Sequence, residues 1–158
     1  NTPGQLPAAV EAKIKSQSGL YRDIFVAYAD CGTGGALDKV LEKYGVDRIP
    51  GAHCYEFFAG TDVFNAIANV EPGSFYLTDF LTRHFERLVI KGLGMDRLPQ
   101  LIPVYFGNYK RIVYLAQSES GELQTMANNH ADYLGLEFEY HSCCDTPLSR
   151  VLKPALER

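Results

Sequence analysis

The 158-residue chain has a net charge of −4 and a hydrophobic share of 46%, the balance of a soluble globular protein with its own core. A mildly acidic chain lacks the basic surface that attracts phosphates, so nucleic acid is not an expected partner. No apolar run approaches the ~20 residues of a membrane span, so a membrane is not expected either. No export leader is visible, and a cytoplasmic protein is expected; because the chain begins at Asn1 and not at Met, export of a longer precursor stays the open alternative.

Helical patterns and short apolar runs alternate along the first part of the chain. LPAAVEAKIKSQSG predicts a helix from Pro7 to Gly19, and IFVAYA predicts a buried strand over residues 24–29. ALDKVLEKY, residues 36–44, is amphipathic and predicts a second helix. The stretch 46–60 fits either a short strand near 47–49 or a loop that leads into a helix from about Ala52.

The same alternation continues to the carboxyl terminus. A strand is predicted for SFYLT, and an amphipathic helix follows it from Asp79 to about Gly92. In a further helix, residues 99–106, Pro103 predicts a kink or an early stop. The remaining predicted elements are a strand over 111–117, a helix over 121–135, a strand over 136–141 and a helix from Thr146 onward. Because polar and apolar residues alternate in LEFEYH, we expect an edge strand with one exposed face.

This order of strands and helices favours a parallel sheet with helices on both faces. We expect a three-layer Rossmann-like or flavodoxin-like α/β sandwich with a mainly parallel sheet of four to five strands. The sequence contains no internal repeat and no linker, so residues 1–158 are predicted to form a single domain.

All four cysteines follow the ends of predicted strands. Cys31 follows the first strand, Cys54 the doubtful second one, and Cys143 and Cys144 the last. Ligands of open α/β sheets bind beyond the carboxyl ends of the strands, so these thiols are expected to line a site. Thr78, Asp79, Gln117, Ser118 and His141 hold similar positions. The alternative is four inert buried thiols.

The turn after the first predicted strand is the first candidate site. Cys31 precedes the start of a helix, where the helix dipole and free N–H groups favour a thiolate. Backbone N–H groups of Gly32, Thr33, Gly34 and Gly35 are predicted to bind an anion or a cofactor. The alternative is that these glycines only permit a tight turn.

The second candidate is a metal site. Thiolate, imidazole and carboxylate are the usual ligands of zinc, and His53, Cys54 and Glu56 offer all three. We therefore predict a transition metal, zinc or iron, held by Cys31, Cys54 and His53. Cys143 and Cys144 are predicted as secondary ligands or redox thiols. The spacing matches no zinc finger, and buried thiols remain the alternative.

DCGTGG after an apolar strand also resembles the glycine-rich motif of S-adenosylmethionine-dependent methyltransferases. Such a site needs an acidic residue at the end of the next strand, and Glu56 is the only nearby one. The chain has no GxxxxGK, HExxH or GxSxG motif.

Three blocks together resemble a known family. They are VAYADCGTGGALDKVLEKYGVDRIPGAHCYEFFAG, PGSFYLTDFLTRHFERLVIKGLGMD and YFGNYKRIVYLAQ, and they are similar to the domain of unknown function family 1638. The similarity runs from about Pro7 to Leu148, and Cys31 and Cys54 match the family's cysteine positions. The resemblance implies a further βα segment before the first helix. It also implies an association with corrinoid-dependent methyl transfer and one-carbon metabolism, with a corrinoid methyltransferase system as partner and a corrinoid as a candidate cofactor.

Three functions therefore stay open. The leading hypothesis is a metal- or cofactor-binding protein with a Cys/His site at the carboxyl edge of the sheet, accessory to corrinoid-dependent methyl transfer. The second is a methyltransferase that uses S-adenosylmethionine or a corrinoid-linked methyl donor. The third is a non-catalytic partner protein of a methyltransferase. An aromatic docking surface would support the third, with Tyr105, Phe106, Tyr109 and Tyr114 as its members; core packing is the alternative reading of these rings.

Overall fold

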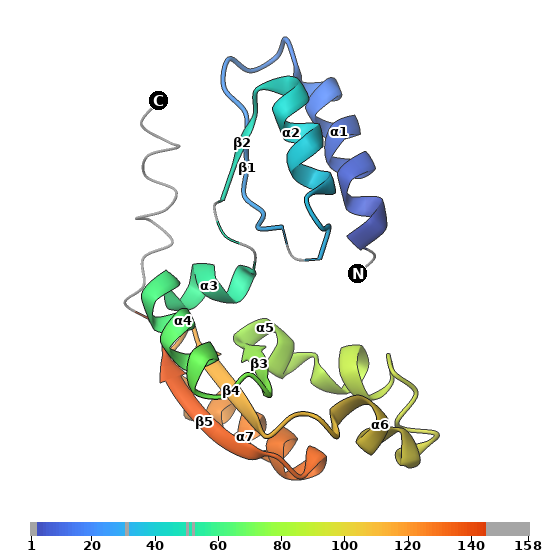
Figure 1. Ribbon diagram of the computed structural model, residues 1–158, viewed down its shortest axis with the longest axis vertical. Coiled ribbons are helices and arrows are strands. Elements are labelled where there is room, and N and C mark those ends of the chain that lie inside the picture. Colours follow the sequence, from blue (N-terminus) through green and yellow to red (C-terminus); the bar gives the residue numbers. More distant parts are fainter. Residues whose placement is uncertain (1–2, 31, 50, 52, 145–158) are drawn as a thin grey trace. The chain divides into compact units, whose positions relative to one another are not determined.

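The computed structural model describes residues 3–30, 32–49, 51 and 53–144. The chain divides into two compact units (Figure 1). Of the described residues, those from 3 to 61 belong to unit 1 and those from 62 to 144 to unit 2. Each unit has its own parallel sheet, and each is described separately below. The expectation of a single domain stays a prediction.

Unit 1 is built from short elements. A 3-10 turn, Pro3–Gln5, leads into α1. The other elements are α1 (Leu6–Gln17), β1 (Phe25–Val26), α2 (Ala36–Tyr44), β2 (Asp47–Arg48) and α3 (Cys54–Ala59). β1 and β2 pair in parallel, with Phe25 opposite Asp47 and Val26 opposite Arg48. The stretch 46–60 thus contains both of the alternatives weighed above, a short strand and then a helix.

The core of unit 1 lies between its two longer helices. Ile14 of α1 packs with Leu37 and Leu41 of α2, and all three side chains are buried. The predicted helix over residues 36–44 is confirmed, but the predicted strand over 24–29 shrinks to two residues. It ends early because the Val26 carbonyl accepts the Tyr28 N–H at 2.8 Å, which turns the chain.

Arg48 fastens the end of β2 to its surroundings. Its guanidinium donates to both carboxylate oxygens of Asp38 on α2, at 2.5 and 3.0 Å. It also donates to the carbonyls of Ile49 and Gly51, at 2.6 and 2.9 Å. This planar fork fixes α2, β2 and the following loop with one side chain.

Unit 2 contains a three-stranded parallel sheet in the order β3-β4-β5. The helix α4 (Thr61–Val70) precedes β3 (Ser74–Thr78), and α5 (Asp79–Arg83) follows it. The other elements are α6 (Ile102–Phe106), β4 (Arg111–Ala116), α7 (Gly121–Leu134) and β5 (Glu137–Ser142). Thr78 lies opposite Leu115, which lies opposite His141, so the three strands end together at one edge.

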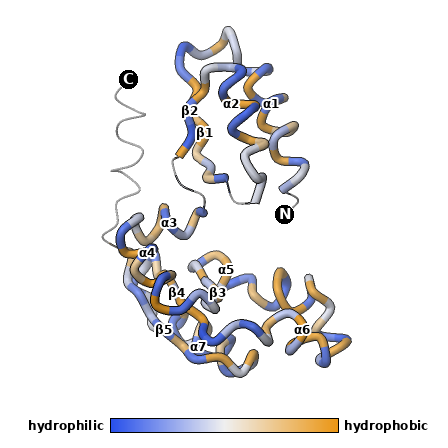
Figure 2. The backbone as a smooth tube through the Cα atoms, in the orientation of Figure 1, coloured by the Kyte–Doolittle hydropathy of each residue, from blue (hydrophilic) through white to orange (hydrophobic). Residues whose placement is uncertain are grey.

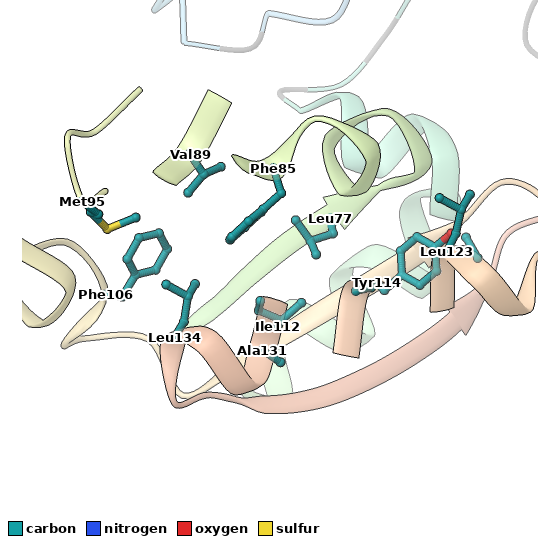
Figure 3. Packing of buried hydrophobic residues seen from close by; sticks show 12 residues of the cluster. Leu77, Phe85, Val89, Met95, Phe106, Ile112, Tyr114, Leu123, Ala131 and Leu134 are labelled. Carbon is teal, nitrogen blue, oxygen red and sulfur yellow. The ribbon is translucent and has the colours of Figure 1, made fainter. Parts of the chain in front are cut away.

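One face of this sheet carries the main core (Figure 3). Leu77, Ile112 and Tyr114 project from the strands into a cluster with Phe85 and Leu123, and none of these five side chains is more than 1% exposed. α5 and α7 contact each other and cover this face. The helices show orange and blue segments along their length, as amphipathic elements do (Figure 2).

The opposite face holds a charged network under α4. The buried Arg111 guanidinium donates to Ser74 Oγ at 2.8 Å, to the Glu139 carboxylate, and to the Ile67 carbonyl of α4 at 2.8 Å. A cation near the end of a helix also complements its dipole. Phe64 of α4 adds a ring contact with Tyr76 at 5.2 Å. Unit 2 therefore has helices on both faces of its sheet.

Two predicted helices differ in detail. The one expected from Asp79 to Gly92 breaks at His84, whose φ of −111° leaves the helical range, and resumes as a π-helical segment, Glu86–Ile90. The one expected over 99–106 is a 3-10 turn, Pro99–Leu101, followed by α6. Pro103 neither kinks nor stops it, because a proline in the first turn leaves no N–H unpaired.

The described residues show a mixed α/β protein with two parallel sheets, of two and three strands. The predicted Rossmann-like or flavodoxin-like sheet of four to five strands is not seen in the described residues. Their five strands form two separate sheets, and no described hydrogen-bonded strand pair joins β1 or β2 to the three-stranded sheet. β5 is an edge strand, as predicted. The helix expected from Thr146 lies outside the described residues. None of the helices in the described ranges has the length and apolarity to cross a membrane.

Candidate functional site

Asp79 is the centre of a polar cluster where β3 and β4 end. Its Oδ1 accepts the Tyr114 hydroxyl at 2.8 Å and the Gln117 N–H at 3.0 Å. Its Oδ2 accepts the Ser118 hydroxyl at 2.5 Å. In return, the Asp79 N–H donates to Gln117 Oε1 at 2.8 Å. The strand ends are therefore locked together by a half-buried carboxylate that has three donors.

The local sequence explains why Asp79 is placed there. Thr78 caps α5 by accepting the Leu81 N–H at 3.3 Å, so Asp79 is the first helical residue, where a negative charge is favourable. Tyr114 is fully buried, and its hydroxyl reaches Asp79 from the core side of the sheet. Burial and the neighbouring Asp79 carboxylate raise the pKa of Tyr114, so it stays a neutral donor.

Cys143 and Cys144 lie beside this cluster, directly after β5. The Cys143 N–H donates to the Ala116 carbonyl at 2.7 Å, and the Cys144 Sγ lies 3.8 Å from the same oxygen. Both thiols are free. Cys143 is 6% exposed and Cys144 is half-buried. The Ala116 carbonyl at the end of β4 therefore holds the Cys143 backbone and the Cys144 thiol, whereas the Cys143 Sγ lies 3.9 Å from the His141 carbonyl.

Cys143 is held in its neutral form. Burial raises its pKa to about 11, with further contributions from Cys144 and from the Asp79 carboxylate. A thiol with such a pKa is a poor nucleophile at neutral pH. The same three groups would repel one another if ionised, so a bound cation is what would favour two thiolates here.

The glycine-rich turn of unit 1 contains its own anion. The Asp30 carboxylate accepts the Thr33 hydroxyl, and the Gly35 N–H lies 3.3 Å from its Oδ2. Gly32, Gly34 and Gly35 all have positive φ, between 60° and 87°, so glycine is required by the path of the chain. This geometry agrees with the tight-turn reading. Binding of an external anion there stays a prediction.

The block after β2 contains an exposed imidazole and a half-buried thiol. His53 precedes α3 and Cys54 is its first residue. Glu56 of the same helix lies close to Gly51, where a Cβ would be 2.8 Å from its Oε2, and the φ of 105° at Gly51 favours glycine. Cys31, the expected third ligand, lies outside the described residues.

Among the residues that the structure describes, no three His, Cys, Asp or Glu side chains gather closely enough to hold a metal ion. Cys143 and Cys144 lie together in unit 2, and His53 and Cys54 are neighbours in unit 1. The set Cys31, His53, Cys54, Cys143 and Cys144 is not seen as one site, and its metal role stays a prediction.

The network of Arg111 and Glu139 was not predicted. The alternation of LEFEYH suggested an exposed polar face, but Glu139 is only partly exposed and binds both Arg111 and His141. The His141 ring and Arg111 hold the pKa of the Glu139 carboxyl below its usual range. An arginine at the start of a wholly apolar strand was the signal in the sequence, since a buried guanidinium needs an acidic partner.

The aromatic residues proposed for docking mostly belong to the core. Phe106 and Tyr114 are buried, and Tyr109 packs against the same cluster. Tyr105 is 44% exposed. The core-packing reading therefore holds for three of the four rings, and the partner hypothesis has only Tyr105 left from this group.

Comparisons with known proteins give a family. No curated protein and no solved structure matches the chain. The sequence profile described as protein of unknown function (DUF1638) matches residues 1–150, which is nearly the whole chain and includes all four cysteines. The chain belongs to the DUF1638 family of proteins of unknown function.

Proposed function

We propose that the protein binds a thiophilic metal ion through cysteine thiolates at the carboxyl ends of its parallel strands. One observation carries this proposal: two adjacent cysteines without a disulfide, Cys143 and Cys144, follow β5 where the three strands of unit 2 end, and the Cys143 backbone N–H and the Cys144 Sγ both contact the Ala116 carbonyl. In parallel sheets this edge is the usual place of ligands. Soft thiolates are preferred ligands of zinc, iron–sulfur centres and Cu(I).

Electrostatics supports a cation at this edge. The Asp79 carboxylate has three hydrogen-bond donors and therefore serves as a fixed negative charge rather than a free ligand. Burial is the main cause that raises the pKa of the Cys143 thiol, and Cys144 and the Asp79 charge raise it further. A metal ion at the sulfurs would remove this repulsion and displace the thiol protons.

Unit 1 supports a second thiol group in the same protein. β1 and β2 are neighbours and parallel, so the segments that lead to Cys31 and to Cys54 leave the same edge of that sheet. With His53 they would supply the nitrogen and sulfur ligands that zinc prefers. Cys143 and Cys144, which form no disulfide, also fit a reducing compartment, and we propose the cytoplasm on this ground.

Methyl transfer has less support. Among the described contacts none identifies a nucleoside or corrinoid site, and the Gly35 N–H is already directed at Asp30. A role beside a corrinoid methyltransferase system, with S-adenosylmethionine or a corrinoid as methyl donor, stays a prediction from the sequence.

A spectroscopic titration with Co(II), which replaces zinc, tests metal binding. We expect the reduced full chain to develop the charge-transfer absorption of a Co(II)–thiolate bond at a stoichiometric endpoint. The double variant Cys143→Ser/Cys144→Ser should lose the unit 2 contribution, and Cys31→Ser/Cys54→Ser the unit 1 contribution. Absence of this absorption in the wild-type protein, with circular dichroism showing it folded, would refute the proposal.

A further inference from the structure

The outer side of β5 is an open edge of the unit 2 sheet. Among the described residues, β5 has a neighbouring strand on one side only (Figure 1). The opposite edge strand, β3, is covered, because Ser74, Leu77 and Thr78 are each 8% exposed or less. None of the six side chains of β5 is buried, and Tyr140 is 38% exposed. The edge along β5 is therefore the accessible one of the two.

The backbone of β5 offers a row of hydrogen-bonding groups on this open side. The N–H groups of Glu137 and Cys143 both donate toward β4. Because the backbone groups of successive residues point to opposite sides of a strand, Phe138, Tyr140 and Ser142 direct their N–H and C=O groups outward. Such a row is a template on which another strand can pair.

The sequence of β5 lacks the features that usually keep an edge strand from pairing. Edge strands are commonly protected by lysine, proline or a bulge, and EFEYHS contains neither lysine nor proline. Its register with β4 is continuous from Glu137 to Ser142, so β5 has no bulge. The Glu139 carboxylate forms an ion pair with Arg111, so its charge is a weak barrier to a second strand.

We propose that β5 pairs antiparallel with β5 of a second copy of this chain, about a twofold axis at Tyr140. In this register Glu139 lies opposite His141 of the copy, and the twofold axis repeats the same complementary pair. Each imidazole can donate an N–H to the carboxylate of the copy, as it contacts Glu139 of its own chain in this structure. A register centred on Glu139 would instead place two carboxylates opposite each other, which is unfavourable. Charge complementarity thus favours a second copy and sets its register.

The other face of the paired strands is aromatic. Tyr140 already contacts the Tyr114 ring, with the ring centroids 5.9 Å apart. In the dimer the two Tyr140 residues are directly opposite each other, and Phe138 is opposite Ser142 of the copy. The two three-stranded sheets become one continuous sheet. A six-residue edge buries less area than a standard interface, so we expect a dimer that depends on protein concentration. This inference goes beyond metal binding and does not depend on it.

Sedimentation equilibrium of the reduced full chain, over a range of concentrations, tests this pairing. The mass should rise with concentration from 17.6 kDa toward twice that value. Tyr140→Lys places two like charges opposite each other at the axis, and we expect it to weaken dimerisation about tenfold or more. The matched control is Tyr133→Lys, at a tyrosine of α7 that is 43% exposed, and it should dimerise like the wild-type protein.

Amide hydrogen exchange followed by NMR identifies the strand that pairs, and it needs no variant. At concentrations where the dimer forms, exchange of the Phe138, Tyr140 and Ser142 N–H groups should slow about tenfold or more, because these groups gain partners. A chain that stays monomeric at all concentrations would overturn the inference and leave this edge free or reserved for another protein. A dimer with unchanged exchange at these three amides, or undiminished dimerisation of a folded Tyr140→Lys, would overturn it as well.

Discussion

Units 1 and 2 contain the same kinds of element but differ in the length of their strands and the size of their cores. Both have parallel strands, covering helices and thiols beyond the strand ends. Unit 2 has strands of five and six residues on a large core, whereas the described part of unit 1 has two strands of two residues and a buried cluster of three side chains, Ile14, Leu37 and Leu41. The difference indicates that unit 2 holds its polar cluster on a rigid frame. In unit 1 the corresponding residues follow loops that are held chiefly by the contacts of Arg48 and Asp30.

The largest expected effect compares the two cores. Leu77 and Leu37 are both fully buried. Leu77→Ala should cost about 4 kcal/mol, and Leu37→Ala about 3 kcal/mol, because a smaller cluster can collapse more easily around the cavity. Hydrogen exchange followed by mass spectrometry would locate each effect, with Leu37→Ala raising exchange chiefly in unit 1. Equally faster hydrogen exchange in both units of Leu37→Ala would show that the two cores do not unfold separately.

The next effect concerns the two arginine anchors. Arg111→Ala should cost about 3 kcal/mol, because Ser74 Oγ and the Ile67 carbonyl lose the guanidinium as donor and Glu139 keeps only His141 of its two described partners. Arg48→Ala is the matched variant in unit 1, and its cost should be smaller because its partner Asp38 is 41% exposed. Urea denaturation of both variants measures the comparison, and a larger loss for Arg48→Ala would reverse it.

Asp79→Asn tests the polar cluster at the strand ends. The amide keeps one acceptor but turns an NH2 group toward donors, so we expect a loss of about 2 kcal/mol. Asp30→Asn is the control in the turn of unit 1, where the carboxylate is bound by Thr33 and Gly35. Thermal denaturation should show the larger decrease for Asp79→Asn. An unchanged melting temperature for Asp79→Asn would mean that the three hydrogen bonds of Asp79 do not hold the strand ends together.

A smaller effect is expected on acidification. Because the pKa of Glu139 is lowered in the folded protein, its contribution to stability is present above the unfolded pKa, and it is lost as pH falls through the lowered folded pKa. The ordinary pKa of a glutamate carboxyl is 4.5, so the loss of stability falls at and below that pH. Urea midpoints measured across this range should fall less steeply for Glu139→Gln than for the wild-type protein. Parallel slopes would contradict the role of Glu139.

The last prediction concerns the reactivity of the Cys143 and Cys144 thiols and not the stability of the fold. With the pKa of Cys143 near 11, iodoacetamide should alkylate Cys144 before Cys143 at neutral pH. Labelling of Cys143 should rise steadily between pH 7 and 9, as counted by mass spectrometry of digested protein. Asp79→Asn should raise it modestly, since burial is the largest cause of the shift. Preferential labelling of Cys143 would contradict the buried environment that raises its pKa.

Local sequence patterns predicted the elements that are determined by interactions between neighbouring residues. Ser74–Thr78 and Ala36–Tyr44 have the predicted bounds because propensity, caps and apolar spacing agree there. β1 is shorter than its apolar run because a single hydrogen bond, from the Tyr28 N–H to the Val26 carbonyl, turns the chain after Val26. Such a turn between near neighbours leaves no mark in composition.

The candidate site was predictable only in part. The rule for parallel strands placed Asp79, Gln117 and Ser118 at strand ends, and the structure joins them. The contribution of Tyr114 depends on the register that sets Leu77 opposite it, and a register cannot be read from one strand. The separation into two sheets has the same origin, since strand pairing is decided by contacts distant in sequence.

The most direct measurement is X-ray absorption on the full chain, purified in reducing buffer without chelators and taken at the edge of the metal it retains. Thiolate binding predicts stoichiometric metal with sulfur atoms in its first coordination shell, and a loss of sulfur scattering in Cys143→Ser/Cys144→Ser. A protein that retains no metal after loading, or a metal surrounded only by oxygen and nitrogen, would contradict it.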